Sequence, residues 1–212
     1  MIDADAFVQA TPREIAPHLS DAIHLWRLPW RPSQARTPLL DVLAAYLCVD
    51  ASTLMLEENA HGKPRLGGTH ALHFNWSHSG EFALVALARD LELGVDIEHP
   101  RTDVRALELA QRFFTTSEAA ALSQCETSSR ETAFLQLWCA KEAVLKAIGR
   151  GIAFGLERVE FARVRGRWEP RHFDAEAGHV AEWQVLPVTI SANYIGALAW
   201  RGAARPVNAW TL

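Results

Sequence analysis

The feature that most constrains the fold is a change of periodicity along the chain. Residues 102–148 show helical spacing of apolar side chains in three segments, 102–114, 117–124 and 129–148. The segments before and after this block are short apolar stretches bounded by turn residues, which is typical of strands. An order of strands, helices and strands predicts an α+β architecture and argues against a regularly alternating parallel sheet.

Start and stop signals indicate where the expected elements begin and end. Thr115 and Glu118, like Ser128 and Glu131, have the offset of a capping box, and Gly149 suits the left-handed end of the last helix. An earlier helix is expected over residues 37–48. The expected strands cover residues 23–30, 72–76, 82–88, 91–98, 158–164, 182–186 and 194–200.

Size, charge and cysteine content restrict the class of protein. The chain has 212 residues, enough for one large domain or two packed smaller ones. Its formal charge of −4 provides no basic field for a phosphate backbone, so nucleic acid is not expected as a partner. Cys48, Cys125 and Cys139 lack CxxC spacing and indicate reduced thiols, which favours a cytoplasmic protein. The sequence shows neither a secretory signal nor an apolar run near the ~20 residues of a spanning helix, so no membrane association is expected.

An acidic motif, Gly94-Val95-Asp96-Ile97-Glu98, ends one of the expected strands. Because side chains alternate along a strand, Asp96 and Glu98 project from one face, with α-carbons about 7 Å apart. Two such carboxylates repel each other unless a cation lies between them, and a hard divalent ion is the usual solution. Removing Asp96 is accordingly not expected to destabilise the fold. On its own, the pentapeptide fits a solvated sheet edge better than a metal site.

The expected helix 129–148 carries an acid and a base on one side. Glu142 and Lys146 are one turn apart and face the same way, and Leu135 and Trp138 flank Glu142. An acid on a partly apolar helix face is unusual. The same spacing nevertheless describes an ordinary surface pair of glutamate and lysine, which is the commoner case for a helix taken alone.

Two further segments contain groups suited to an anion. Phe74-Asn75-Trp76-Ser77-His78-Ser79-Gly80 places hydroxyls and an imidazole in an expected turn between two strands. Gly62-Lys63-Pro64 puts a cation on a stiffened loop. Each has a plain alternative, because a Ser-His-Ser-Gly turn usually satisfies its own backbone and a lone loop lysine carries little information.

Together and in this order, the motifs resemble the Sfp-type 4'-phosphopantetheinyl transferase family. The resemblance covers residues 62–151. It includes the three motifs above, the segment Arg112-Phe113-Phe114-Thr115-Thr116-Ser117-Glu118, and the helix Trp138-Cys139-Ala140-Lys141-Glu142-Ala143-Val144-Leu145-Lys146. The acidic pair and the Trp-x-x-Lys-Glu-x-x-x-Lys helix are the signature elements of that family, and both are intact here.

The resemblance implies transfer of the 4'-phosphopantetheine group from coenzyme A to a serine of an apo acyl or peptidyl carrier protein, with release of 3',5'-ADP. It implies that Asp96, Glu98 and Glu142 bind Mg²⁺ together with the pyrophosphate of coenzyme A. Glu142 is expected to take the proton of the carrier serine, and Lys146 to face the phosphate that is cleaved. Beside the metal, Glu142 is expected to stay ionised, so that its basicity comes from its position.

The side chains that the resemblance assigns to coenzyme A come from the two loop motifs and the catalytic helix: Lys63, Pro64, Ser77, His78 and Lys146. Family members often have basic residues in the first helical segment that reach the 3'-phosphate. Here Arg36 is the expected residue, with Arg31 nearby.

The family fold implies two similar α+β halves packed pseudo-symmetrically, with the site in the cleft between them. The expected halves are residues 1–100, with the coenzyme A-binding loops and the acidic pair, and residues 101–212, with the catalytic helix 129–148. A family member of this length is expected to be a monomer.

Other readings of the same residues stay open. A metal-dependent phosphohydrolase would use the carboxylates to activate water, and a noncatalytic coenzyme A or nucleotide-binding module would use Glu142 only within its helix. Arg105 and Arg112 share one side of an expected helix. That side could contact an acidic carrier protein, or it could be an ordinary helix face exposed to solvent. The histidines lack the spacing of a zinc site.

Overall fold

The computed structural model describes residues 1–68, 70–100 and 105–212. Five strands form one sheet in the order β1-β12-β2-β6-β5, and three strands form a second sheet in the order β10-β11-β7. Two hairpins, β3-β4 and β8-β9, complete the strand pairs of the described residues. The architecture is mixed α+β, as the order of sequence patterns predicts.

The α-helices of the described residues are α1 (Pro12–Ile15), α2 (Thr37–Leu47), α3 (Ala106–Phe113), α4 (Thr116–Ser123) and α5 (Thr127–Ile148). The strands before α3 are β1 (Phe7–Gln9), β2 (Ile23–Pro29), β3 (Leu56–Glu58), β4 (Pro64–Leu66), β5 (Leu72–Ser79), β6 (Phe82–Arg89) and β7 (Leu93–Glu98). The strands after α5 are β8 (Val159–Val164), β9 (Arg167–Phe173), β10 (Trp183–Ser191), β11 (Tyr194–Arg201) and β12 (Val207–Thr211).

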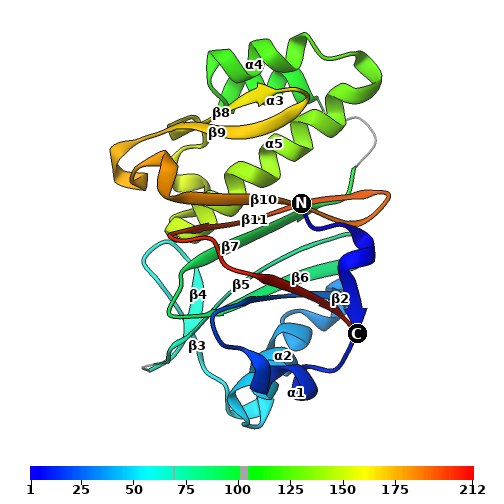
Figure 1. The fold of residues 1–212 in the computed structure, drawn as a ribbon, viewed down its shortest axis with the longest axis vertical. Coiled ribbons are helices and arrows are strands. Elements are labelled where there is room, and N and C mark those ends of the chain that lie inside the picture. The colour runs from blue at the N-terminus through cyan, green and yellow to red at the C-terminus, as the bar shows by residue number, and fades with distance from the viewer. Residues whose placement is uncertain (69, 101–104) are drawn as a thin grey trace.

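The two main sheets face each other, and helices cover their outer faces (Figure 1). α2 packs on the five-stranded sheet through an apolar cluster that contains Trp26 and Leu43. Leu25 and Val95 belong to a second apolar cluster between the two sheets. α5 covers the other face of the three-stranded sheet, with α3, α4 and the β8-β9 hairpin beyond it (Figure 1).

Segments from opposite ends of the chain pair within each sheet. β12 runs parallel to β2, with Val207 opposite Ile23, and also parallel to β1. β7 runs antiparallel to β11, with Asp96 opposite Ala197. Each of the two main sheets therefore combines strands from before and after residue 100.

Strand β7 separates the inter-sheet apolar cluster from α5. Val95 and Ile97 are buried in that cluster, whereas Asp96 between them projects to the opposite face and bonds Lys146 of α5. The period of two along a strand thus places an acidic side chain against the helix within an otherwise apolar strand. Asp96 is itself buried, with 5% of its surface exposed.

The long helix matches its prediction closely. α5 ends at Ile148, and Gly149 follows in the left-handed conformation with a φ of 82°. The capping box of Thr115 and Glu118 is present at the start of α4. The second expected capping box is absent, because α5 begins at Thr127 and its N-cap, Glu126, makes no side-chain capping bond. Residues 102–104, at the start of the helix expected over residues 102–114, lie outside the described residues.

Several short strands have no counterpart in the sequence-based prediction: β1, β3, β4, β9 and β12. Four of the five contain only three to five residues. Such strands carry too little periodic pattern to be recognised, and their existence depends on partners that are distant in the chain.

Candidate active site

The serine-histidine motif is the end of a strand and not a turn. β5 stays paired with β6 as far as Ser79, which lies opposite Phe82, and the turn consists of Gly80, with a φ of 58°, and Glu81. The strand expected over residues 72–76 is therefore present, and the expectation that Ser77, His78 and Ser79 lie in a turn is wrong. Polar residues are tolerated in this strand because three of them bond to β7, which lies alongside.

The side chains on one face of β5 hold the acidic end of β7. Asn75 Oδ1 accepts a hydrogen bond from the Val95 amide at 2.8 Å. Ser77 Oγ donates to Asp96 Oδ1 at 2.8 Å. Farther along, Ser79 Oγ donates to Glu98 Oε2 at 3.2 Å and accepts from the His99 amide at 3.0 Å. The alternation of polar residues in the motif thus fixes the two carboxylates relative to β5.

Gly94 permits α5 to lie directly against β7. A Cβ atom at this position would be 2.0 Å from the Ala143 carbonyl oxygen and 2.5 Å from the Ala147 amide nitrogen. Real Cβ atoms do not approach backbone so closely, so any larger residue would force the helix away. The glycine that opens the acidic motif therefore brings the helix with Glu142 and Lys146 against the strand with Asp96.

Glu142 is buried beside the acidic pair. Only 6% of its surface is exposed. Burial raises the pKa of its carboxyl to about 7; Asp96 raises this pKa further, Lys146 opposes the shift, and Glu98 adds to it. The three carboxylates are therefore close enough to act on one another. Without a bound cation this carboxyl is therefore only partly ionised near neutral pH, whereas the expectation that Glu142 stays ionised applies beside the metal.

Lys146 lies at the centre of the cluster. Its Nζ donates to Asp96 Oδ1 at 2.6 Å, to Ser77 Oγ at 3.0 Å and to the Val95 carbonyl at 3.2 Å. Burial alone would lower the pKa of this ammonium, but the charge and hydrogen bond of Asp96, together with the charge of Glu142, outweigh burial and raise the pKa. The expectation that Asp96 meets only repulsion in the protein is therefore wrong, because the lysine neutralises it.

The acidic side chains of the site have the donor chemistry of a divalent-cation site. Asp96 Oδ2 is buried and has no hydrogen-bond partner in the part of the chain that the structure describes. Among the same residues, no group of three or more histidine, cysteine, aspartate or glutamate side chains is arranged as a ready ligand set. The donor chemistry of Asp96, Glu98 and Glu142, all oxygen, fits a hard cation such as Mg²⁺, and the free Oδ2 is an available ligand.

A polar pocket of about 510 Å³ opens next to Lys146. Its lining includes five of the residues that the sequence analysis assigns: Arg36, Pro64, Ser77, His78 and Lys146. Trp30 and Trp76, which the sequence analysis does not assign, also line it. Burial and the nearby Lys146 lower the pKa of His78. Cations, hydroxyls and aromatic faces together suit a phosphorylated nucleotide.

Lys63 lies outside this pocket. It lines a neighbouring pocket of about 400 Å³ with Pro64, and its ammonium pairs with Glu92 and donates to the Leu93 carbonyl at 3.3 Å. Arg36 lines the first pocket and also pairs with Glu58 at 3.1 Å on the surface. The structure therefore brings most of the assigned residues together and separates Lys63 from them.

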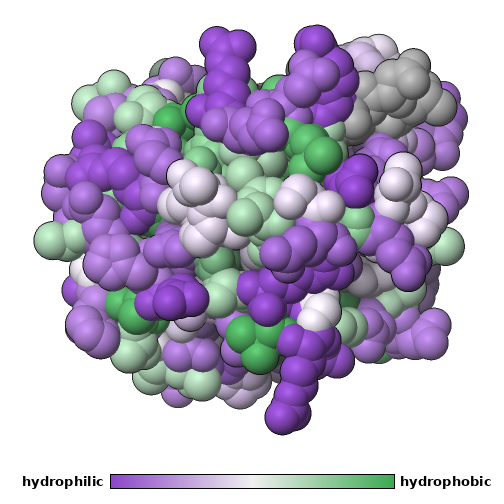
Figure 2. Space-filling model, turned by 90° about the horizontal axis from the view of Figure 1, so that it is seen from above, coloured by the Kyte–Doolittle hydropathy of each residue, from purple (hydrophilic) through white to green (hydrophobic). Residues whose placement is uncertain are grey.

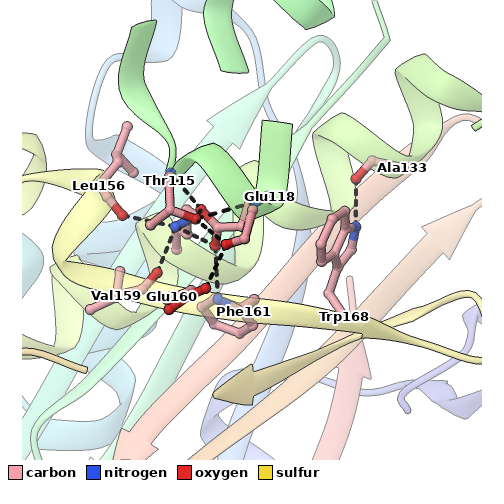
Figure 3. Close-up of polar contacts among 10 residues, drawn as sticks. Thr115, Glu118, Ala133, Leu156, Val159, Glu160, Phe161 and Trp168 are labelled. Carbon is pink, nitrogen blue, oxygen red and sulfur yellow. Dashed lines mark hydrogen bonds and ion pairs between the residues drawn. The ribbon is translucent and has the colours of Figure 1, made fainter. Parts of the chain in front are cut away.

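The first lysine of the signature helix has a structural environment that the sequence does not reveal. Lys141 and Glu118 are fully buried and form an ion pair at 2.7 Å. Lys141 Nζ also donates to the carbonyls of Leu156 and Val159 at 2.8 and 2.6 Å, while Glu118 accepts from the Phe161 amide at 2.7 Å (Figure 3). This network joins α4, α5 and β8 on the far side of α5 from Asp96.

The arginines proposed for carrier contact lie at α3. Arg105 precedes the helix and pairs with Glu108 at 3.0 Å, and Arg112 packs over the Phe113 ring. The molecule seen from this end is largely hydrophilic, with apolar groups between polar ones (Figure 2).

All three cysteines are free thiols. Among the described residues, no helix combines the length and apolar character required to cross a bilayer.

Comparison with known proteins identifies the class. A family model described as the 4'-phosphopantetheinyl transferase superfamily matches residues 92–199, which include β7, α5 and most of β11. The 4'-phosphopantetheinyl transferase HetI of Nostoc sp. is 30% identical over 91% of this chain and 93% of its own length. A putative 4'-phosphopantetheinyl transferase of Synechocystis sp. is 32% identical over 78% of this chain and 69% of its own. Sfp of Bacillus subtilis is 32% identical over 58% of this chain and 55% of its own.

This chain therefore belongs to the 4'-phosphopantetheinyl transferase superfamily, and it is an enzyme of the transferase class. The residues matched by the family model contain all three carboxylates and Lys146. Arg36, Ser77 and His78 lie before the matched segment and reach the site through the fold.

Proposed function

We propose that the protein transfers the 4'-phosphopantetheine group of coenzyme A to a serine of an apo acyl or peptidyl carrier protein and releases 3',5'-ADP. The observation that carries this proposal is the contact of Lys146 on α5 with Asp96 on β7, beside a pocket lined by Arg36 and His78. A transfer of this type requires acidic metal ligands, a base and cations for phosphate at one place, and these elements meet here.

The proposed reaction forms a bond between the serine oxygen and the phosphorus that carries pantetheine. The bond from that phosphorus to the oxygen of the adenosine 5'-phosphate breaks, and 3',5'-ADP leaves. Glu142 takes the serine proton, directly or through water. Beside a bound cation its carboxyl stays ionised, so it acts as a base through its position. Lys146 stabilises negative charge on the phosphate oxygens as the bond breaks.

We propose that Asp96, Glu98 and Glu142 hold Mg²⁺ together with the pyrophosphate. When bound, the ion neutralises phosphate charge and orients the reacting groups. Ser77 holds Asp96 from the strand side, and Ser79 holds Glu98. Lys146 contacts both Asp96 and the pocket, so its ammonium can turn from the carboxylate toward a phosphate without moving the helix.

The assignment of coenzyme A contacts follows the pocket. Ser77, His78, Lys146, Arg36 and Pro64 are proposed at the phosphates and nucleotide, and Arg36 is proposed at the 3'-phosphate. Lys63 is proposed to lie along the nucleotide, from the neighbouring pocket that it lines together with Pro64.

We further propose that two similar halves, residues 1–100 and 101–212, enclose the site in the cleft between them. The exchange of β7 and β12 between the sheets supports a close association of these halves. The helix after β7, with Arg105 and Arg112, is the proposed meeting place with the acidic carrier. Action as a monomer in the cytoplasm stays a prediction from the sequence.

The test is an incubation of purified protein with coenzyme A, Mg²⁺ and an apo carrier protein. We expect the carrier to gain the mass of one phosphopantetheine arm while 3',5'-ADP appears in equal amount. Nucleotide release without a change in the carrier would indicate a phosphohydrolase. Tight binding of coenzyme A with neither product would indicate a noncatalytic binding module.

A further inference from the structure

One tryptophan that lines the pocket beside Lys146 stacks on a histidine of the same pocket. Trp30 follows directly after β2, and its indole stacks on the His78 imidazole with ring centroids 3.8 Å apart and planes 16° from parallel. Trp76 approaches the same imidazole at 5.0 Å with a tilt of 54°. The imidazole of His78 is therefore confined by aromatic rings at the mouth of the pocket.

The polar atoms of Trp30 bind two further segments of the pocket. Its backbone amide donates to the Glu81 carbonyl at 2.8 Å, in the turn after the strand with His78. Its indole Nε1 donates to the Ala35 carbonyl at 3.0 Å, in the loop before α2. Trp30 thus connects the end of β2, the β5-β6 turn and the loop that leads to Arg36.

The loop that receives the indole hydrogen bond has a strained backbone. Ala35 has a φ of 47° and a ψ of −119°, a conformation that residues with a side chain rarely adopt. Strained residues of this kind persist where the surrounding structure holds them, and they are concentrated at functional sites. Arg36, which lines the pocket, is the next residue. The bond from Trp30 to the Ala35 carbonyl therefore fixes the backbone from which Arg36 projects.

Of the three basic side chains that line the pocket, Arg36, His78 and Lys146, two are tied to Trp30. Tight binding of a phosphate requires donors that are already oriented before the ligand arrives. We propose that Trp30 is a positioning residue for coenzyme A, which holds His78 by stacking and Arg36 by its bond to the Ala35 carbonyl. This inference rests on the proposed function only for the identity of the ligand.

The matched control is a second tryptophan with the same kind of bond elsewhere. Trp168 of β9 is also partly buried, and its Nε1 donates to the Ala133 carbonyl at 2.8 Å (Figure 3). It does not line the pocket of Trp30. Replacing either tryptophan by phenylalanine keeps an aromatic ring and deletes one indole hydrogen bond, so the two variants remove the same kind of bond at different places.

The experiment measures coenzyme A binding by calorimetry and steady-state kinetics for Trp30→Phe, Trp30→Ala and Trp168→Phe. Trp30→Phe loses the bond to the Ala35 carbonyl, so Kd and KM for coenzyme A should rise roughly 3- to 10-fold. Trp30→Ala also loses the stacking, which should add about another 10-fold. The kcat should change little in both variants, because the lost interaction acts on binding. Trp168→Phe should retain the wild-type Kd and KM.

Nuclear magnetic resonance gives a readout that a general loss of stability does not reproduce. Ring protons of His78 stacked on an indole are shifted upfield, and this shift should persist in Trp168→Phe and disappear in Trp30→Ala. Thermal melting of each variant establishes that it is folded at the assay temperature, and Trp30→Phe retains a ring if Trp30→Ala unfolds. Wild-type Kd and KM in a folded Trp30→Phe variant, or an unshifted His78 in the wild-type protein, would overturn the inference.

The outcome is separable from that of the proposed function. If the wild-type protein binds coenzyme A but leaves the carrier unmodified, the proposed transfer fails while the binding comparison still decides the role of Trp30. If the carrier is modified and the Trp30 variants bind coenzyme A as well as Trp168→Phe does, the transfer stands and the positioning role fails.

Discussion

Replacing Lys141 by methionine should destabilise the protein far more than an ordinary surface charge deletion. Lys141 and Glu118 are both 0% exposed, so solvent does not screen their 2.7 Å pair. The substitution leaves the Glu118 charge buried and removes a donor from the carbonyls of Leu156 and Val159. Breaking a buried pair from one side costs about 3–5 kcal/mol. For a chain of this size that corresponds to a drop in melting temperature of about 6–20 °C.

The assay is thermal and urea denaturation followed by circular dichroism. Arg65→Met serves as the control, because Arg65 pairs with Glu57 at 2.9 Å while both side chains are more than half exposed, and such a pair contributes about 0–1 kcal/mol. The double variant Glu118→Gln with Lys141→Met should recover a large part of the loss, since no uncompensated charge stays buried. A Lys141→Met variant that melts with the Arg65→Met control would refute the reasoning.

Three further outcomes follow from contacts in the site and the core. Gly94→Ala should lower the melting temperature and abolish carrier labelling, because its Cβ would lie 2.0 Å from the Ala143 carbonyl oxygen and displace α5; wild-type labelling would count against this packing. Asp96→Ala should abolish labelling and also reduce thermal stability, since Lys146 loses its partner at 2.6 Å; unchanged melting would contradict the second part. His24 is fully buried, and burial lowers its pKa from 6.5 to about 4. The unfolded chain takes up a proton there as the pH falls through 6.5 whereas the folded protein does not, so His24 should contribute a decrease in stability of about 3 kcal/mol down to pH 4. Glu142, whose pKa is raised to about 7, contributes in the opposite direction over the same range, so the His24 contribution is measured as a difference. In urea denaturation, the change in stability from pH 7 to pH 4 should be less favourable for the wild type than for His24→Asn by about 3 kcal/mol; equal changes would contradict this.

The local elements of the site could be predicted because their patterns are self-contained. Alternation alone puts Asp96 on the opposite face of its strand from Val95 and Ile97, and the structure has that arrangement. The helical period with Gly149 as its stop gives helix α5 to within two residues of its observed start. Both patterns depend only on residues close in the chain.

Contacts between distant segments could not be predicted, since no periodicity encodes them. The parallel pairing of β12 with β2 joins the two ends of the chain, and its five residues carry no signal of that partner. The serine-histidine motif has the composition of a turn, yet pairing with β6 extends it as a strand. The stacking of Trp30 on His78 likewise depends on two strands that meet only in the folded protein.

The most direct test of the central claim follows the intact mass of an apo carrier protein as Mg²⁺ is titrated, with wild-type enzyme and with Glu142→Ala. The account predicts that the wild-type enzyme adds one phosphopantetheine arm to the carrier only when Mg²⁺ is present, and that Glu142→Ala adds none. Full labelling by Glu142→Ala, or labelling by the wild-type enzyme that is indifferent to Mg²⁺, would contradict it.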